Sequence, residues 1–202
     1  MSTPATASTA FFGIEPDRFD FAWPGHAIFG AGCAQQLPAW IEAQGVRRPL
    51  VLTDAGLVRA GIVAPLVDAL GAAGLAPMLF DGVAANPTLG NVSQARACWD
   101  AQRCDGLVAI GGGSVIDVGK VLVAGLCSDA PIATVLREGD RALSRRAAPF
   151  AALPTTAGTG SESTAAALIK DDQGRKHVLR SRRSRPQCGA LDPLLPLSVP
   201  RP

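Results

Sequence analysis

The sequence predicts an α/β fold with a mainly parallel sheet and helices on both of its faces. Short, continuously apolar runs alternate along the chain with longer segments in which apolar residues recur at helical spacing. Continuous apolar strands are typical of a sheet covered on both faces, and helices of roughly 10–15 residues between them suit the crossovers of parallel strands. One of the apolar runs ends abruptly in three glycines, where a strand is expected to turn into a helix.

Each expected element has a residue range. Extended segments are expected at 21–29, with a turn near Pro24-Gly25, and at 49–53, 76–80, 107–110 and 150–153. Helices are expected at 34–44, 63–73, 89–102 and 114–126, with Ser114 as the N-cap of the last. Residues 165–180 have the pattern of a hairpin that turns at Asp171-Asp172-Gln173-Gly174. Residues 128–149 have no clear period and are expected to form a surface loop.

Length and composition limit the class of protein. The chain has 202 residues, of which 48% are hydrophobic and 18% charged, and these values suit one globular domain with a sizeable core. A formal net charge of +2 gives no strong field that would favour nucleic acid or a membrane. No apolar run reaches the roughly 18 residues of a membrane span. Residues 1–10 lack the basic start and apolar stretch of a signal peptide, so we expect residues 1–18 to be a disordered tail.

The cysteines indicate the redox environment. There are five, Cys33, Cys98, Cys104, Cys127 and Cys188, and they are widely spaced without a C-x-x-C motif. An odd number at such spacing is typical of free thiols in a reducing cytoplasm. We expect each to behave as a small buried hydrophobic residue.

A glycine-rich turn, Gly111-Gly112-Gly113-Ser114, stands between an expected buried strand and an expected helix. Ligands of open parallel sheets bind beyond the carboxyl ends of the strands. Glycines let the backbone approach a phosphate closely, and a helix N-terminus supplies N–H groups and a positive dipole end. The turn therefore predicts a pyrophosphate cradle, with a tight turn that binds no ligand as the alternative. Ile116 replaces the third glycine of G-x-G-x-x-G, and Val121 replaces the Ser or Thr of a P-loop, so the turn is neither motif.

A second segment, Pro154-Thr155-Thr156-Ala157-Gly158-Thr159-Gly160-Ser161-Glu162, follows another expected buried strand. It brings four hydroxyls and two glycines into one loop, which can form several short hydrogen bonds to phosphates or to a ribose. The alternative, an ordinary polar surface loop, is disfavoured because the segment follows a core strand directly.

These two segments, with Val115-Ile116-Asp117 and Lys120 after the glycine turn, resemble the iron-dependent (group III) alcohol dehydrogenases. Shorter matches follow in that family's order: Phe29-Gly30-Ala31-Gly32, Thr53-Asp54, Asn86-Pro87-Thr88, Arg175-Lys176 and Asp192-Pro193. The resemblance runs from about Phe19 to the last residue. It implies a dehydroquinate synthase-like, nucleotide-binding α/β domain at residues 19–191, the N-terminal domain of this family.

The resemblance also implies cofactor-binding roles. Asp54 corresponds to the carboxylate that binds the adenosine ribose hydroxyls, and because it would repel a 2′-phosphate it favours NAD over NADP. Asn86 corresponds to an adenosine-side contact, and Lys176 to the lysine that reaches the nicotinamide ribose. The diphosphate and nicotinamide-side loop corresponds to Gly112, Gly113, Ser114 and Asp117, and the second nucleotide loop to Thr155, Thr156 and Thr159. Without the resemblance, Asp54 and Lys176 would be interpreted as exposed surface charges.

The metal of this family has no counterpart among these matches. The resemblance implies iron or another divalent metal held by one Asp and three His of a helical second domain. The chain has only His26 and His177, neither in a matching motif, and Asp192 belongs to the strand end that precedes that domain. We therefore assign no catalytic and no metal-binding residue. Residues 192–202, which hold four prolines, are expected to begin a missing C-terminal metal-binding domain and to form no closing helix.

Three functions remain open. The first is an NAD-dependent alcohol dehydrogenase, which moves hydride between a small alcohol or aldehyde and NAD and is expected to be a cytoplasmic homodimer. This chain would be a truncated form, inactive on its own. The second is a nucleotide-binding fragment without catalysis, and the third is a glycerol dehydrogenase-like or dehydroquinate synthase-like relative, which the threonine-rich loop disfavours.

A basic run lies outside these assignments. It consists of Arg175, Lys176, Arg180, Arg182, Arg183 and Arg185, and it is denser than the resemblance leads us to expect. A solvated hairpin face is the favoured interpretation, with nucleic-acid contact as the alternative. No nucleic-acid or membrane partner is expected.

Overall fold

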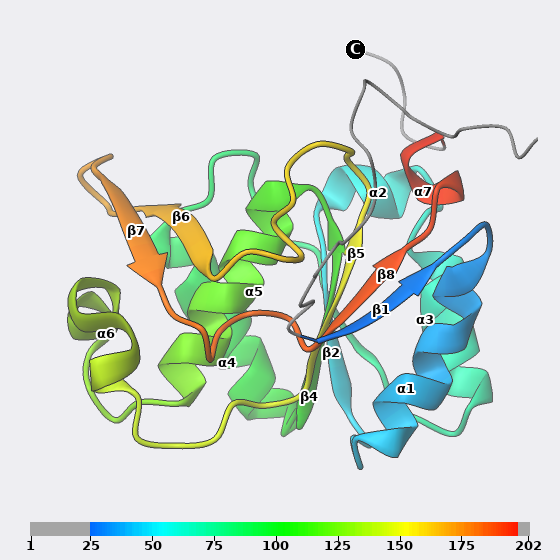
Figure 1. Ribbon diagram of the computed structural model, residues 1–202, viewed down its shortest axis with the longest axis horizontal. Coiled ribbons are helices and arrows are strands. Elements are labelled where there is room, and N and C mark those ends of the chain that lie inside the picture. The colour runs from blue at the N-terminus through cyan, green and yellow to red at the C-terminus, as the bar shows by residue number, and fades with distance from the viewer. Residues whose placement is uncertain (1–24, 198–202) are drawn as a thin grey trace, which may run out of the picture.

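A computed structural model describes residues 25–197, in which six strands form one parallel sheet (Figure 1). Every neighbouring pair in the sheet is parallel. In spatial order the strands are β1 (His26–Phe29), β8 (Cys188–Leu191), β5 (Phe150–Pro154), β4 (Gly106–Gly111), β2 (Pro49–Leu52) and β3 (Met78–Phe80). A separate antiparallel hairpin consists of β6 (Ala166–Lys170) and β7 (Lys176–Arg180). The expected tail at 1–18 and the start of the expected segment 21–29 lie outside the described residues.

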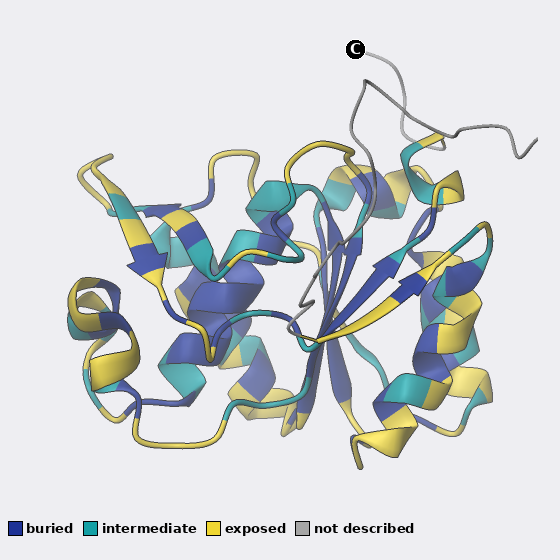
Figure 2. Ribbon diagram, in the orientation of Figure 1, coloured by how far each residue is buried: buried dark blue, intermediate teal, exposed yellow. Residues whose placement is uncertain are grey.

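The central strands are apolar throughout because both of their faces are covered. In β4, Leu107 and Ala109 belong to one hydrophobic cluster, whereas Val108 and Ile110 belong to the cluster on the opposite face. Figure 2 shows the middle strands as buried along most of their length. The predicted α/β fold, with a parallel sheet between two helical layers, is confirmed.

The helices form two layers. On one face lie η1 (Cys33–Gln36), α1 (Leu37–Ala43), α2 (Ala55–Arg59) and α3 (Ala64–Ala72). On the other face lie α4 (Leu89–Gln102), α5 (Gly113–Leu126) and α6 (Ile132–Glu138), followed by η2 (Gly139–Ala142) and the hairpin. Within residues 25–197, no helix combines the length and the apolar character needed to cross a lipid bilayer.

Helix α5 lies between the sheet and the hairpin, and this position explains its sequence. Its residues from Val118 to Ala124 are all buried, so it is apolar on nearly every side. Gly119 lets it approach β5 closely, since a Cβ at that position would lie 2.8 Å from Cζ of Phe150. The glycine turn, which directly precedes α5, is therefore attached to a tightly packed part of the core.

Several expectations about single elements were wrong. The expected surface loop at 128–149 contains α6 and η2; α6 has only seven residues, so its apolar face of Ile132, Val135 and Leu136 is too short to stand out as a periodic pattern. Helix α5 begins at Gly113 with Gly112 as its N-cap, so Ser114 is not the cap. The proline-rich end contains a single helical turn, α7 (Leu194–Leu197). Helix α2 was not predicted, and the strand that ends before Asp192, β8, was given no residue range.

Candidate functional site

The glycine turn and the threonine-rich loop meet at the carboxyl edge of the sheet, where β4 and β5 lie side by side. Gly111 is paired with Pro154 in the sheet register, and the N–H of Thr155 donates to the carbonyl of Gly111 at 3.0 Å. A Cβ at Gly112 would lie 3.2 Å from Oγ1 of Thr156. The two loops therefore share one surface, and a side chain at Gly112 would fill the space between them.

A cleft of about 830 Å³ opens at this edge. It is bounded by the loops that follow β2, β3, β4 and β5. Five of the predicted cofactor-binding residues line it: Asp54, Gly112, Ser114, Thr155 and Thr156. We call it the carboxyl-edge cleft. Because all of these residues follow parallel strands, the topology brings them together even though about a hundred residues separate the first from the last.

Backbone groups of α5 face this cleft. Gly112 is the N-cap, so the first turn of α5 presents N–H groups that have no partners within the helix, together with the positive end of the helix dipole. The hydroxyl of Ser114 donates to the carbonyl of Ala85 at 2.8 Å, which ties this turn to the loop after β3. The arrangement is suited to an anion such as a diphosphate.

Asp54 has a structural contact as well as a place in the cleft. It is the N-cap of α2, where its Oδ1 accepts from the N–H of Leu57 at 3.0 Å. Asp54 follows β2. This is the second strand of the parallel sheet in chain order, since β1 is the first. Arg59, at the end of the same short helix, lines the cleft too, and no motif in the sequence had indicated it.

Asp117 lies one helical turn further along α5, where its carboxylate bonds to protein groups. Oδ1 accepts from the hydroxyl of Ser161 at 2.6 Å, and Oδ2 accepts from the N–H of Leu168 at 2.9 Å. These bonds fasten the threonine-rich loop and β6 to α5. Asp117, which the resemblance groups with the glycine turn as a cofactor contact, therefore also positions the threonine-rich loop.

Lys120 completes this network and is fully buried. Its ammonium donates to Oγ of Ser161 at 3.0 Å, to Oγ1 of Thr164 at 3.0 Å and to the carbonyl of Ala166 at 2.7 Å, and lies 3.5 Å from Oδ1 of Asp117. Burial lowers the pKa of Lys120, and the neighbouring carboxylate of Asp117 partly offsets this effect. The amine thus uses all three of its donors to hold the end of the loop.

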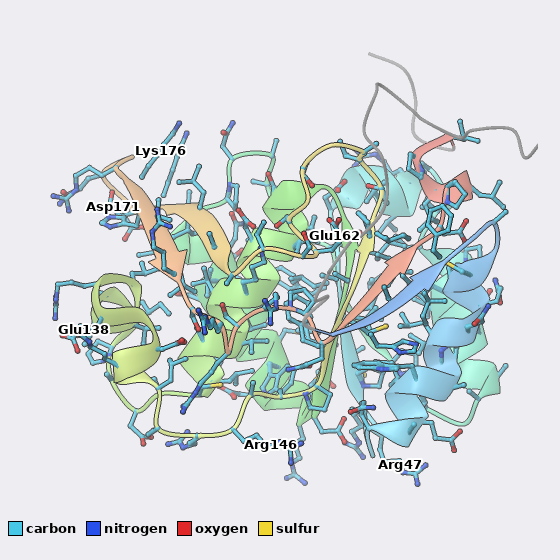
Figure 3. The ribbon with its side chains drawn as sticks, in the orientation of Figure 1. Arg47, Glu138, Arg146, Glu162, Asp171 and Lys176 are labelled. Atoms are coloured by element: carbon cyan, nitrogen blue, oxygen red, sulfur yellow. The ribbon has the colours of Figure 1, made fainter. Side chains whose placement is uncertain are left out.

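The remaining predicted residues lie outside the cleft. Gly113, Asp117 and Thr159 line a second, smaller hollow of about 220 Å³ beside the hairpin. Asn86 is exposed and lines neither hollow. Lys176, labelled in Figure 3, is the exposed first residue of β7 at the tip of the hairpin and also lines neither.

Glu162 ends the threonine-rich loop and was quoted in the motif but given no role. Its Oε2 is buried and accepts no hydrogen bond from the described part of the chain. The residue borders a hollow of about 240 Å³ that Phe29 and Asp192 also line. Its position directly after a loop rich in glycines and hydroxyls was the signal that could have marked Glu162 as a site residue.

Among residues 25–197, no three His, Cys, Asp or Glu side chains are close enough together to hold a metal ion. His26 begins β1, whereas Nε2 of His177 lies 2.9 Å from Oδ2 of Asp171 in the hairpin. The carboxylate of Asp192 accepts the N–H groups of Gly32 and Ala34 at 3.0 and 3.2 Å. These side chains therefore do not fit a catalytic metal centre.

The fold and its loops define an α/β domain whose ligand site lies at the carboxyl edge of a parallel sheet. The chain belongs to the iron-containing alcohol dehydrogenase family, which it matches over residues 24–193. It is 39% identical over 177 residues to 4-hydroxybutyrate dehydrogenase of Cupriavidus necator, covering 87% of this chain and 45% of that protein. It is 36% identical over 169 residues to lactaldehyde reductase of Escherichia coli K12, covering 82% of this chain and 44% of that protein. The chain thus spans less than half the length of these curated relatives.

Solved structures show the same likeness. A sulfoacetaldehyde reductase from Bifidobacterium kashiwanohense, solved in complex with NAD+, superimposes with a TM-score of 0.81 at 32% identity, covering 91% of this chain and 48% of that one. A 1,3-propanediol oxidoreductase also superimposes with a TM-score of 0.81, at 31% identity, covering 88% of this chain and 46% of that one. The resemblance inferred from the motifs is confirmed.

Proposed function

We propose that this chain is the nucleotide-binding part of an NAD-dependent alcohol dehydrogenase of this family. The single observation that carries the proposal is that Asp54, the glycine turn and the threonine-rich loop line one cleft at the carboxyl edge. Its volume of about 830 Å³ lies in the range of clefts that hold small-molecule ligands. The relatives' names refer to small alcohols and aldehydes, and we propose that class of substrate here.

The residues of the cleft would divide the cofactor between them. The first turn of α5 would bind the diphosphate through backbone N–H groups, with Gly112 leaving room for it. Thr155 and Thr156, on the loop beside that turn, would donate hydroxyls. Asp54 would accept the adenosine ribose hydroxyls, and its charge would oppose the 2′-phosphate of NADP. Asn86, Thr159 and Lys176 are proposed to contact the parts of the cofactor that extend beyond the cleft.

The cofactor held by these residues would supply hydride-transfer chemistry between an alcohol, which also loses its hydroxyl proton, and the corresponding aldehyde or ketone. The described residues supply binding and orientation for that step. Because they bring together no metal-ligand set, we derive no step through a metal. We also propose a reducing cytoplasmic location, which is supported by five free cysteines, four of them buried, and a homodimer as the assembly.

A second candidate is a nucleotide-binding module without catalysis, which the lack of a metal-ligand set within residues 25–197 favours. A third is a glycerol dehydrogenase-like relative. Turnover tests whether this chain catalyses by itself: the purified chain with NAD and added iron or zinc is assayed with small primary alcohols and with glycerol. We expect no NADH from the chain alone, and metal-dependent NADH production would contradict the binding-only candidate.

The binding proposal is tested by titrating the purified chain with NADH and following its fluorescence. Gly112→Ala should weaken binding about tenfold, or about 1.4 kcal/mol, because the added methyl group enters the space that the diphosphate needs. Gly71→Ala is a matched control, since a Cβ at Gly71 meets nothing within 4 Å and the residue lies in α3, away from the cleft. Equal NADH affinity in both variants would contradict the assignment of the cleft.

A further inference from the structure

The hairpin packs against α5 through β6, and two side chains of α5 bond to the backbone of that strand (Figure 1). Alternate residues of a strand direct their backbone groups to the same side, and Ala166 and Leu168 direct theirs away from β7. The carbonyl of Ala166 accepts from the ammonium of Lys120 at 2.7 Å, and the N–H of Leu168 donates to Oδ2 of Asp117 at 2.9 Å. Asp117 and Lys120 therefore bond to β6 where a neighbouring strand would.

The apolar side of the hairpin does not by itself fix its position along α5. Ala167, Ile169 and Leu179 are buried in the same hydrophobic cluster as α5. Burial of apolar surface is non-directional, so these contacts hold the hairpin against the helix without setting its exact position. Hydrogen bonds require short distances and defined angles, so the bonds from Asp117 and Lys120 set where β6 lies along the helix.

Asp117 also joins the hairpin to the loops of the carboxyl-edge cleft. Its Oδ2 accepts the N–H of Leu168 in β6, and its Oδ1 accepts the hydroxyl of Ser161 in the threonine-rich loop. Asp117 lies about one helical turn after Gly113, where α5 begins. The residue before that start, Gly112, lines the cleft. One carboxylate therefore fixes the hairpin relative to both loops that line the cleft.

The position of the hairpin sets one wall of the hollow of about 220 Å³ beside it. Gly113 and Thr159 line this hollow from the two loops. Leu168 and Val178, which are paired across the hairpin, line it from the strands and are 43% and 46% exposed. Because Gly112 lines the cleft and Gly113 lines the hollow, a ligand bound at the start of α5 can extend from one into the other.

We propose that Asp117 is a positioning residue for the nicotinamide half of the cofactor, which it serves by holding the hairpin at this hollow rather than by touching the cofactor. The inference rests on the proposed function, because it takes bound NAD to extend from the cleft into the hollow. The resemblance groups Asp117 with direct cofactor contacts, whereas both of its carboxylate oxygens accept hydrogen bonds from protein groups. The adenosine and diphosphate half, bound in the cleft, should not depend on the hairpin.

The test compares NADH with ADP, which carries the adenosine and diphosphate but neither the second ribose nor the nicotinamide. Dissociation constants of both are measured by isothermal titration calorimetry on the purified 202-residue chain. Asp117→Asn keeps the size of the side chain but leaves one acceptor oxygen for two donors. We expect NADH affinity to fall about tenfold and ADP affinity to change by less than about twofold. A general loss of stability would lower both affinities together.

Leu168→Pro separates positioning from direct contact, because it leaves Asp117 in place and removes the N–H that Asp117 binds. Proline is tolerated in edge strands where the N–H points away from the ladder. Leu168→Ala is the matched control, since it shortens the same side chain and keeps the N–H. We expect NADH affinity about fivefold lower in Leu168→Pro than in Leu168→Ala, with ADP affinity within about twofold in both.

Circular dichroism checks the fold of each variant. Should Leu168→Pro fail to fold, a double-mutant cycle between Asp117→Asn and Lys176→Met, at the hairpin tip, takes its place. If Asp117 acts by placing the hairpin, Lys176→Met should lower NADH affinity in the unsubstituted chain and have a smaller effect once Asp117 is replaced.

Three results would overturn the proposal and leave the assignment of the cleft intact. Equal losses of NADH and ADP affinity in Asp117→Asn would show a general effect on the fold, and unchanged NADH affinity would show no role in binding. A loss of NADH affinity in Asp117→Asn that Leu168→Pro does not reproduce, or additive losses in the cycle with Lys176→Met, would mean that Asp117 contacts the cofactor directly. An unsubstituted chain that binds neither NADH nor ADP would instead refute the proposed function, and this inference with it.

Discussion

The two edges of the six-stranded sheet present hydrogen-bond donors of different kinds. At the carboxyl edge the donors are backbone N–H groups of α5 and short hydroxyl side chains, and Asp54, an acid that lines the cleft, caps a helix. At the amino edge the donors are guanidinium side chains on two connecting segments. They line a hollow of about 530 Å³, which we call the arginine pocket: Arg145, Arg146, Arg182, Arg183 and Arg185. The first set is fixed by the backbone and by the topology of the strands. The second set depends on side-chain charge, so binding there should vary more strongly with salt.

The edges also differ in how they are held. The threonine-rich loop at the carboxyl edge is fastened by the buried amine of Lys120, which has no exposed surface. The margin of the arginine pocket is fastened by Asp140, which is exposed. Substitutions of these two residues should therefore differ greatly in how much they lower the free energy of unfolding.

The largest effect is expected from Lys120→Met. The substitution leaves Asp117 without its cation and removes the donor to Ser161 and to the carbonyl of Ala166. Breaking a buried pair from one side costs about 3–5 kcal/mol. We expect a loss of this size in the free energy of unfolding measured with urea, and a looser cleft with weaker NADH binding.

Lys176→Met is the matched control for that substitution. Lys176 is exposed at the hairpin tip, so its replacement should change the free energy of unfolding by no more than about 0.5 kcal/mol. A difference between the two variants below 1 kcal/mol would mean that the buried amine does not hold the loop. Weaker NADH binding by Lys176→Met without a loss of stability would support its proposed contact with the cofactor.

A smaller effect is expected at Asp54, where the cleft selects its cofactor. Asp54→Ser keeps an N-cap for α2 but removes the negative charge, so discrimination against NADP should narrow about tenfold, or about 1.4 kcal/mol. Dissociation constants of NADH and NADPH measured side by side give the ratio. Arg59→Gln is the companion variant, because a cation in the same cleft would attract a 2′-phosphate.

The two substitutions should move the ratio in opposite directions. Asp54→Ser should favour NADPH, and Arg59→Gln should favour NADH. Equal affinities for the two cofactors in the unsubstituted chain would refute the role of Asp54. An unchanged ratio in both variants would place the adenosine ribose elsewhere.

The sequence predicted the elements with strong local signals. The expected range of α4, 89–102, agrees with the structure, and a side-chain cap supports its start, since Oδ1 of Asn91 accepts the N–H of Thr88. Helix α6 was missed because its seven residues are too few to show a clear period, although Ile132, Val135 and Leu136 pack against the core at helical spacing. Strand β8 was missed because Cys188-Gly189-Ala190-Leu191 contains no β-branched or aromatic residue.

The site was predictable where strand topology decides it. The residues that line the carboxyl-edge cleft follow strand ends, and five of them are residues that the family resemblance had singled out. The hydrogen-bond acceptors of Lys120 lie 41 to 46 residues away, so the sequence around Lys120 does not indicate that its amine is buried. The arginine pocket was hidden for the same reason, because its two walls converge only after β5 and β8 enter the sheet.

The smallest effect is expected from Asp140→Asn, at the margin of the arginine pocket. Burial would raise the pKa of Asp140, but hydrogen bonds from Ser181 and from the backbone of Arg182 and Arg183 outweigh it, so the pKa lies below its ordinary value of 3.8. A carboxyl group with a lowered folded-state pKa stabilises the fold fully above about pH 4, and this stabilisation is lost as the pH falls through its folded-state pKa.

Because Asp140 is exposed, Asp140→Asn should lower the free energy of unfolding by less than about 1 kcal/mol at pH 7, and by still less near pH 3. Urea unfolding at both pH values gives the two differences, and Asp172→Asn controls for the loss of one exposed negative charge. A cost that stays the same at both pH values would show that the carboxylate charge is not what fastens this edge. NADH binding at the carboxyl edge should not change in either variant, because both substitutions lie away from the carboxyl-edge cleft.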